Sequence, residues 1–466
     1  MMKRILIILM ALFLNSCSLF SKEKNLFQNP DIEKLDNGLH VVWFLDDSLP
    51  LIYYSMIIEG GYKMDPPAHS GTLKLVESLL DRGVKDLSAF ELAKGIEDLS
   101  ASKGIGTGGD YQFVDISGFY FDYKKLLFYL KKMIREPIFS ESEVILQKKR
   151  LIESILQSKE SVKDIGEFYF KRLLQGGTVY SKSQFTSLDE LAGITRDDII
   201  KLHRSVFVPN KSWLLVVGRG NKKLIKKEIL NQFSDWKEDT KKIEPTIQDP
   251  EWLKGTKSNI LIVDKPGQTQ SYVFVGQRAP KKEEVNTYAL EIFNSTLGGS
   301  FTSRLMQDLR EKKGLTYGIG SQIVYNKEHS LFYVSSFTQT VTTGELLKNI
   351  LEHLSKIQRE GCTAEEIQFS KKYLIGAFPV YLNKIEEIAN KWLFSYLDGY
   401  GENYLNFYPE NIEKIELEKL NFEIKKYLNI DQLKIVISGD AKKIKLSLIK
   451  NGFSEFSVIP YSDIFK

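Results

Sequence analysis

Residues 297–317, LGGSFTSRLMQDLREKKGLTY, open with a glycine-rich turn and continue into a predicted helix that ends at Gly314. Arg310, Lys312 and Lys313 would occupy the last turn of this helix, where cations offset the helix dipole. Tyr317 follows where a strand is expected, and an aromatic residue is ordinary in a strand. The segment therefore predicts a turn, a helix and a strand in the second half of the chain.

The same pattern occurs earlier in the chain. Three pairs of segments recur in one order at similar offsets: 94–105 with 304–315, 143–152 with 366–375, and 214–224 with 434–444. Offsets above 200 residues are far too long for a solenoid repeat. They indicate duplication of one domain of about 210 residues, the first spanning 31–236 and the second 259–466, with a linker at 237–258 that contains two prolines.

Each copy has the same predicted order of elements: two strands, an apolar-periodic helix, a short helix ended by a glycine (Gly104 or Gly314), further strands, two long helices and a late buried strand. The predicted pairs are strands 39–44 and 259–263, strands 51–58 and 271–275, helices 70–80 and 285–297, strands 113–121 and 331–336, and strands 213–217 and 433–437. Strands and helices come in runs, which predicts an α+β fold. We expect two homologous domains, each a mainly antiparallel sheet with helices on one face.

Composition excludes several classes of protein. The 466 residues carry a formal charge of only +4, so there is no concentrated basic field to suggest nucleic acid as a partner. Two cysteines, Cys17 and Cys362, cannot form a disulfide scaffold or a cysteine-based zinc site. The five histidines are scattered, and no two lie four residues apart.

The N-terminal sequence is typical of an export signal. A basic start and an apolar run over residues 5–14 predict a signal peptide at 1–16, too short to span a bilayer. Cys17 follows in a context similar to a bacterial lipobox, which predicts lipidation of this cysteine and a polar stalk over 17–30. We expect a lipoprotein anchored in a bacterial cell envelope, on the periplasmic or surface side, with an ordinary signal and a chance cysteine as the alternative.

Residues 70–83, SGTLKLVESLLDRG, follow a predicted hairpin and resemble the early helix of the insulinase, pitrilysin and mitochondrial-processing-peptidase family of zinc metallopeptidases. In that family this helix carries an inverted His-x-x-Glu-His motif, whose two imidazoles share one helix face and bind zinc. The matching positions here are Lys74, Glu77 and Ser78, and the family's third ligand falls at Ser154. Only the Glu remains, so the resemblance implies that this chain holds no metal and that zinc belongs to a partner chain.

Glu77 also has a purely structural interpretation. Lys74 and Glu77 lie three residues apart on a predicted helix, where an ion pair contributes a few tenths of a kcal/mol. A less favoured alternative is a peptidase with different ligands, using His69 with Glu77.

The second half carries a stronger resemblance, because residues 297–317 closely follow the family's C-terminal signature. In the family an Arg and a Tyr at this spacing reach toward the scissile peptide bond, which implies that Arg310 and Tyr317 bind substrate carbonyl oxygens. Arg offers a rigid fork of donors and Tyr one further O–H donor. The resemblance also implies that the two domains form a clam-like shell.

A chain that has lost the zinc motif but kept the Arg and Tyr resembles the non-catalytic half of the family's two-chain enzymes. We therefore expect a substrate-binding subunit of a heteromeric zinc metallopeptidase, inactive alone, with a zinc-bearing homologue as its partner and peptides or unfolded segments as its substrates. The alternative is a stand-alone peptide-binding or scaffold lipoprotein.

Overall fold

The computed structural model describes residue 27 and residues 29–66, 69–181, 188–237, 244–247, 249, 252–253 and 258–464. The predicted signal peptide, Cys17 and most of the stalk lie outside these residues, as does most of the predicted linker. Within the described ranges, no helix is both long and apolar enough to cross a membrane.

The first half of the chain forms one six-stranded sheet in the order β1-β2-β6-β3-β5-β4. Every neighbouring pair is antiparallel except β2 with β6. The strands are β1 (Asp31–Lys34), β2 (His40–Leu45), β3 (Leu51–Glu59), β4 (Ser102–Thr107), β5 (Tyr111–Phe119) and β6 (Ser212–Gly218). The α-helices are α2 (Thr72–Leu79), α3 (Ala89–Glu97), α4 (Tyr123–Arg135), α5 (Glu141–Ser158), α6 (Val162–Gln175), α7 (Leu188–Gly193), α8 (Arg196–Val206) and α9 (Lys222–Phe233).

The second half builds its own six-stranded sheet in the order β12-β7-β11-β8-β10-β9. Its strands are β7 (Ile260–Asp264), β8 (Gln270–Ala279), β9 (Ile319–Tyr325), β10 (Ser330–Gln339), β11 (Lys434–Gly439) and β12 (Ser457–Ile459). Its α-helices are α11 (Thr287–Asn294), α12 (Thr343–Glu360), α13 (Ala364–Ala377), α14 (Ile385–Leu397), α15 (Tyr408–Glu413), α16 (Leu417–Tyr427) and α17 (Ala441–Lys450). Two π-helical turns, η6 (Ser295–Gly299) and η7 (Met306–Lys312), follow α11.

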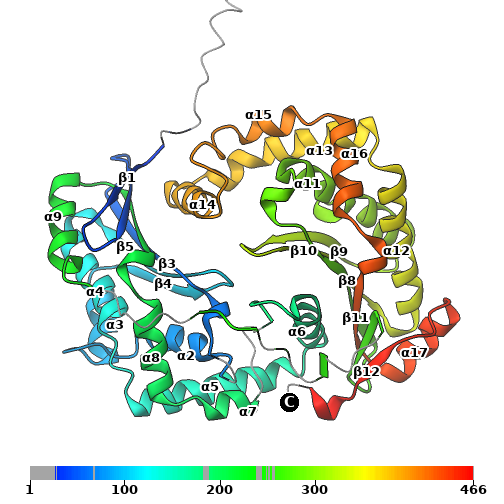
Figure 1. Cartoon of the computed structure of the whole chain (residues 1–466), viewed down its shortest axis with the longest axis horizontal. Helices are drawn as coiled ribbons and strands as arrows, with labels where there is room; N and C mark the ends of the chain where they lie inside the picture. The colour runs from blue at the N-terminus through cyan, green and yellow to red at the C-terminus, as the bar shows by residue number, and fades with distance from the viewer. Residues whose placement is uncertain are drawn as a thin grey trace, which may run out of the picture.

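The two sheets have the same strand order over five positions and differ at one edge. That edge is filled by β1, which is antiparallel to β2, in the first sheet and by β12, which is parallel to β7, in the second. Most pairs in each sheet are antiparallel, so the predicted α+β fold with two similar, mainly antiparallel halves is confirmed. In Figure 1 the halves form an arc.

Two details of the predicted order are wrong. Gly104 does not end a helix: α3 ends at Glu97, and Gly104 lies inside β4. Each half also has three long helices after its β5 or β10 strand rather than two, with α6 and α14 as the additional members. Each of these two additional helices packs on the sheet of the other half of the molecule.

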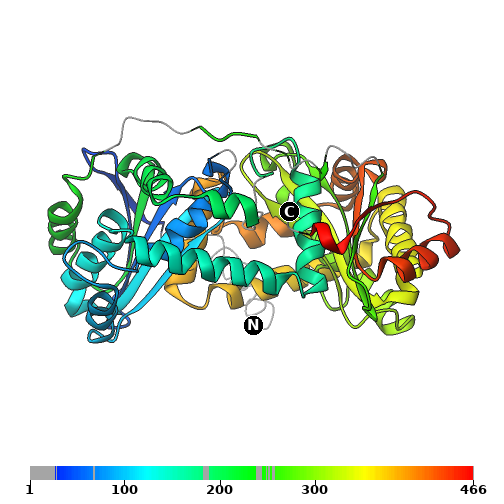
Figure 2. The same cartoon turned by 90° about the horizontal axis from the view of Figure 1, so that it is seen from below.

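Helix α6 comes from the first half but packs on β8 and β11 of the second (Figures 1 and 2). The ring of Phe170 lies 5.3 Å from Phe274 and 5.5 Å from Tyr333. Ser438 Oγ donates a 2.5 Å hydrogen bond to the Val162 carbonyl at the start of the helix. The second face of this sheet is therefore covered by a helix from the first half.

Helix α14 makes the reciprocal contact, from the second half to the first sheet. Its Trp392 meets Phe44 edge to face at 5.7 Å, and Tyr396 meets Trp213 at 5.8 Å. The contact with α14 explains why the central strand β6 is buried along almost its whole length. Helices thus cover both faces of each sheet, not one face as predicted.

A polar clasp joins the halves at a second place, where the β9–β10 hairpin of the second half reaches the first. The carboxylate of Asp110 accepts hydrogen bonds from Lys63 Nζ (2.6 Å), Tyr180 Oη (2.7 Å) and the Lys327 backbone N–H (3.0 Å). Lys327 Nζ also lies 2.8 Å from a carboxylate oxygen of Glu59. Lys327 belongs to the hairpin, while its partners belong to the first half.

Candidate functional site

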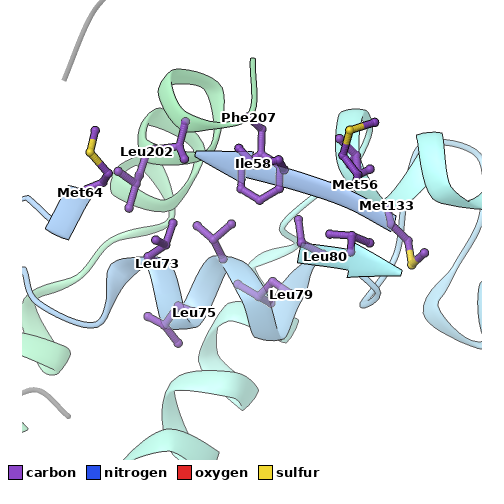
Figure 3. Packing of buried hydrophobic residues seen from close by; sticks show 14 of the residues in the cluster. Met56, Ile58, Met64, Leu73, Leu75, Leu79, Leu80, Met133, Leu202 and Phe207 are labelled. Carbon is purple, nitrogen blue, oxygen red and sulfur yellow. The ribbon is translucent and has the colours of Figure 1, made fainter. Parts of the chain in front are cut away.

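Helix α2 carries the first candidate site: most of its surface is apolar and buried, and one face carries half-buried polar side chains. Leu73, Leu75 and Leu79 are almost fully buried, and α2 packs against α8 and α5. In Figure 3, Leu73 lies toward Leu202 of α8, whereas Leu75 points to the side of α2 away from β3. The Asp65 carboxylate accepts 2.7 Å hydrogen bonds from the backbone N–H groups of Gly71 and Leu73, which anchors the start of the helix. The remaining side of α2 is therefore presented in a fixed orientation.

That remaining side carries Lys74, Glu77 and Ser78, all half-buried. Their spacing of three and four residues places them on one helix face, as the sequence predicts. Lys74 Nζ lies 2.5 Å from Glu77 Oε1, and Ser78 Oγ donates to the Leu75 carbonyl at 2.9 Å. The ammonium of Lys74 thus pairs with the carboxylate, and the Ser78 hydroxyl is bonded to the helix backbone.

The carboxylate of Glu77 is more enclosed than its lysine partner, with 12% of the side chain exposed against 34% for Lys74. Its Oε2 atom is buried without a hydrogen bond. Burial, with Glu77 and Asp65 nearby, raises the pKa of the Tyr62 phenol. The site is a single ion pair in a mainly apolar surrounding.

Ser154, the predicted third position, lies on α5, which packs against α2. Ser154 is exposed, and its backbone carbonyl accepts a 3.0 Å hydrogen bond from Ser158 Oγ. No hydrogen bond or ion pair of the described residues joins Ser154 to Lys74, Glu77 or Ser78. Over the same described part of the chain, no three His, Cys, Asp or Glu side chains come together as metal ligands.

His69, the alternative ligand, is turned toward α8. Its Nδ1 lies 3.6 Å from Asp198 Oδ2, and both side chains are about one third exposed. The Thr195 hydroxyl and backbone N–H, and then His69, lower the pKa of the Asp198 carboxyl against the opposing effect of burial. These contacts give His69 a partner other than Glu77.

Arg310 and Tyr317 form the second candidate site, on the π-helical turn η7 and the segment after it. The chain leaves η7 through Gly314, whose φ of +60° suits a glycine, and the Leu315 N–H bonds the Leu309 carbonyl at 2.9 Å. Beyond this turn Tyr317 is 83% exposed. The Arg310 side chain is one third exposed, and its Nε lies 3.4 Å from Glu311 Oε1.

The contact that supports Arg310 could not be predicted from residue spacing. Its guanidinium lies over the ring of Phe301, 4.9 Å from the centroid, and this ring is itself 59% exposed. Phe301 belongs to the quoted glycine-rich turn, nine residues before Arg310, so only its aromatic character could have signalled the contact. Arg310 is thus held over an exposed ring, and Tyr317 is exposed seven residues further along the chain, while no hydrogen bond or ring contact of the described residues joins the two side chains.

In a comparison with protein families, residues 193–374 match the family described as "Peptidase M16 inactive domain". Among curated proteins, the chain is 23% identical over 412 residues to the "Non-peptidase homolog YmxG" of Helicobacter pylori, covering 87% of this chain and 93% of that one. It is 22% identical over 348 residues to the "Uncharacterized zinc protease YmxG" of Bacillus subtilis, covering 74% and 83%.

Solved structures share the fold. The peptidase M16 inactive domain from Pseudomonas fluorescens superposes with a TM-score of 0.81 at 19% identity, covering 89% of this chain and 98% of that one. A protease from Helicobacter pylori superposes with a TM-score of 0.79 at 21% identity, covering 88% and 100%. This chain therefore shares its fold with these two solved structures over nearly their whole length.

Proposed function

The chain belongs to the M16 family of insulinase-like peptidases, in a non-catalytic role, and from this premise we propose that it is the substrate-binding subunit of a heteromeric zinc metallopeptidase. Its substrates would be peptides or unfolded segments. Catalysis would require a homologue with an intact His-x-x-Glu-His motif, which would hold the zinc.

The observation that carries this proposal is the contrast between the two candidate sites. On α2, Lys74 occupies a ligand position and neutralises Glu77 at 2.5 Å, so a metal would have to displace an ammonium group. In the second half, Tyr317 is almost fully exposed. The Arg310 guanidinium is held over the Phe301 ring, so both donors of the second site are present although the metal ligands of the first are not.

The chemistry of Arg310 and Tyr317 suits a peptide backbone. Both groups donate hydrogen bonds, and carbonyl oxygens of an extended peptide accept them. Phe301 covers one face of the guanidinium, and Glu311 lies 3.4 Å from its Nε, so the terminal N–H groups would be the ones to donate to a peptide. In this role the two side chains would help to orient the scissile bond at the partner's metal.

The predicted lipid on Cys17 would tether the complex to a bacterial envelope membrane, on the periplasmic or surface side. The described part of the chain begins beside the second half: the Phe27 backbone N–H donates to Asn406 Oδ1 at 3.2 Å. A tether at this end would hold both halves close to the membrane. No nucleic acid enters this proposal.

The test is reconstitution of the full-length chain with an M16 homologue from the same cell that carries the intact motif. Arg310→Gln and Tyr317→Phe should each lower kcat of the complex by about 10²–10³-fold if the donors act in the transition state. Glu77→Gln is the matched control and should leave kcat near that of the wild type.

Two results would overturn the proposal. Stoichiometric zinc in the purified chain, with chelator-sensitive peptide cleavage by that chain alone, would make it a peptidase. His69→Ala would then show whether His69 is a ligand. Failure of native-membrane pull-downs to recover any chain with the intact motif would instead favour a stand-alone binding or scaffold lipoprotein.

A further inference from the structure

A basic pocket of about 410 Å³ lies in the first half, and no residue of either candidate site lines it. It is formed by the end of α4 and the turn after it, by α8, and by the residues that follow α9 (Figure 1). Its lining includes Arg135, Arg196, Arg204 and Lys237, and it includes no Asp or Glu. The chain as a whole is nearly neutral, so this concentration of one charge is local.

Two of the four cations are held in place by backbone carbonyls. Arg196 Nε donates to the Phe139 carbonyl at 2.5 Å and Nη2 to the Ile138 carbonyl at 3.1 Å. Arg135 Nη1 donates to the Gln232 carbonyl at 2.6 Å and pairs with the exposed Asp235 at 2.7 Å. The carbonyl oxygens orient Arg196 without offsetting its charge, whereas Asp235 offsets part of the charge of Arg135; each guanidinium keeps further N–H donors.

The other two cations are uncommitted. Arg204 and Lys237 are exposed, and neither has an ion-pair partner among the described residues. Burial lowers the pKa of the neighbouring His203 to about 4, so this imidazole is neutral and the charge comes from the Arg and Lys side chains alone. The buried rings of Phe207 and Trp236 form part of the wall, and an apolar wall strengthens the local field.

We propose that this pocket binds a phosphate group. Three guanidiniums from two elements converge on one small space, and phosphate accepts several charge-assisted hydrogen bonds from such forks. The volume lies within the range of small-ligand pockets and suits a phosphate with a small polar substituent. The phosphate could belong to a lipid headgroup or to a soluble molecule, and the experiment distinguishes these sources. This inference is independent of the proposed peptidase partnership.

The first arm titrates the full-length chain with inorganic phosphate at constant ionic strength and follows heat by calorimetry. Arg204→Gln with Lys237→Gln removes the uncommitted charges and leaves the carbonyl contacts of Arg135 and Arg196 intact, so folding should be unaffected. We expect affinity to fall by about tenfold or more. Lys149→Gln, on the exposed side of α5, is the matched control and should bind phosphate as the wild type does.

The second arm sediments the same proteins with vesicles of phosphatidylcholine alone or of equal parts phosphatidylcholine and phosphatidylglycerol. Any contribution of the N-terminal segment is the same in wild type and variants, so their difference reports on the pocket. Loss of phosphatidylglycerol binding in the double variant, with competition by free phosphate, identifies a lipid headgroup. Phosphate binding with no such vesicle difference identifies a soluble ligand.

The inference would be overturned by no phosphate binding by the wild type, by equal binding by the double variant, or by an equal loss in Lys149→Gln. Tighter binding of a poly-glutamate peptide than of phosphate at the same pocket would also overturn it, because the pocket would then recognise carboxylates of a protein partner.

Discussion

At the scale of single residues, Lys74 and Glu77 depend on each other. The carboxylate is the more enclosed partner, and its Oε2 already lacks a hydrogen bond. Removal of the ammonium would leave a largely buried charge without compensation, whereas removal of both charges would leave no charge that needs a partner.

Lys74→Met should therefore lower the free energy of unfolding by about 1 kcal/mol, and Lys74→Met with Glu77→Gln should recover most of that loss. Urea unfolding of the wild type, the two single variants and the double variant gives the coupling free energy of the pair in a double-mutant cycle. Additive effects of the two substitutions would contradict a coupling between these side chains. A gain of zinc binding in Lys74→His with Ser78→His would show that the helix geometry of a metal site persists beneath the substitutions.

Asp115 gives a second prediction at this scale, because its position on β5 opposite Ser55 removes it from water. Burial raises the pKa of Asp115 to about 6, although the hydroxyls of Ser55 and Tyr53 act in the lowering direction. An unfolded Asp titrates near ~3.9. The protonated carboxyl thus favours the folded state, and its full contribution below about pH 4 is lost as the pH rises through 6.

Asp115→Asn stays neutral at every pH. It should be more stable than the wild type by about 2 kcal/mol at pH 8 and nearly equal to it at pH 4. Urea unfolding at both pH values measures this difference. Asp47→Asn, at an exposed loop position, is the control and should show no such pH dependence. Equal destabilisation by Asp115→Asn at both pH values would contradict the interpretation.

At the scale of elements, the exchanged helices α6 and α14 depend on close contact with a sheet from the other half. Gly166 shows how close this contact is on α6. A Cβ at this position would lie 2.5 Å from Ser438 Oγ and 2.9 Å from the Phe274 ring. A side chain here would have to push the helix away from β8 and β11 or displace those neighbours.

Gly166→Ala should lower the free energy of unfolding by about 2 kcal/mol, although alanine is the better helix former. Gly376→Ala on α13 is the matched control, since its Cβ would meet nothing within 4 Å. That variant should be stabilised by about 0.5–1 kcal/mol. Thermal or urea unfolding of both variants compares the two effects. A stabilised Gly166→Ala would mean that α6 does not pack as closely as described.

The sequence predicts helices and strands from local patterns, but it does not predict which distant element each of them packs against. The apolar period of α2 and the alternation along β5 are local signals that mark one buried face. The apolar surface of α6 matches Phe274 and Tyr333, more than 100 residues away, so nothing in its own segment indicates which sheet it covers. The edge strands β1 and β12 are short and complete sheets from opposite ends of the chain.

The same limit applies to the candidate sites. Helix periodicity alone places Lys74, Glu77 and Ser78 on one face. The support of Arg310 by Phe301 depends on how the glycine-rich turn folds back over η7, which residue spacing does not determine. The basic pocket joins residues from α4, from α8 and from the segment after α9. The nearly neutral composition of the whole chain does not indicate this local charge.

At the scale of the whole molecule, the clasp at Asp110 and the exchanged helices hold the halves in one arrangement by different means. The helices bury apolar area, whereas the clasp gathers a carboxylate, an ammonium, a phenol and a backbone N–H in a place where Asp110 is 8% exposed. Buried charge is costly unless every partner is present, so the clasp should form or break as a unit.

Asp110→Asn should therefore loosen the contact between the β9–β10 hairpin and the first half while leaving each sheet intact. The neutral amide cannot compensate the ammonium of Lys63, and the two amide hydrogens now face a donor, the Lys327 N–H. We expect backbone hydrogen exchange to rise at residues 326–329 and 108–111 by about tenfold or more, the effect of a local loss near 1.4 kcal/mol. Lys222→Gln, which removes the exposed pairs with Asp31 and Glu33, should leave exchange in the hairpin unchanged. Faster exchange spread evenly over β3, β5 and β10 would instead mean that Asp110 stabilises the fold of each half rather than the contact between them.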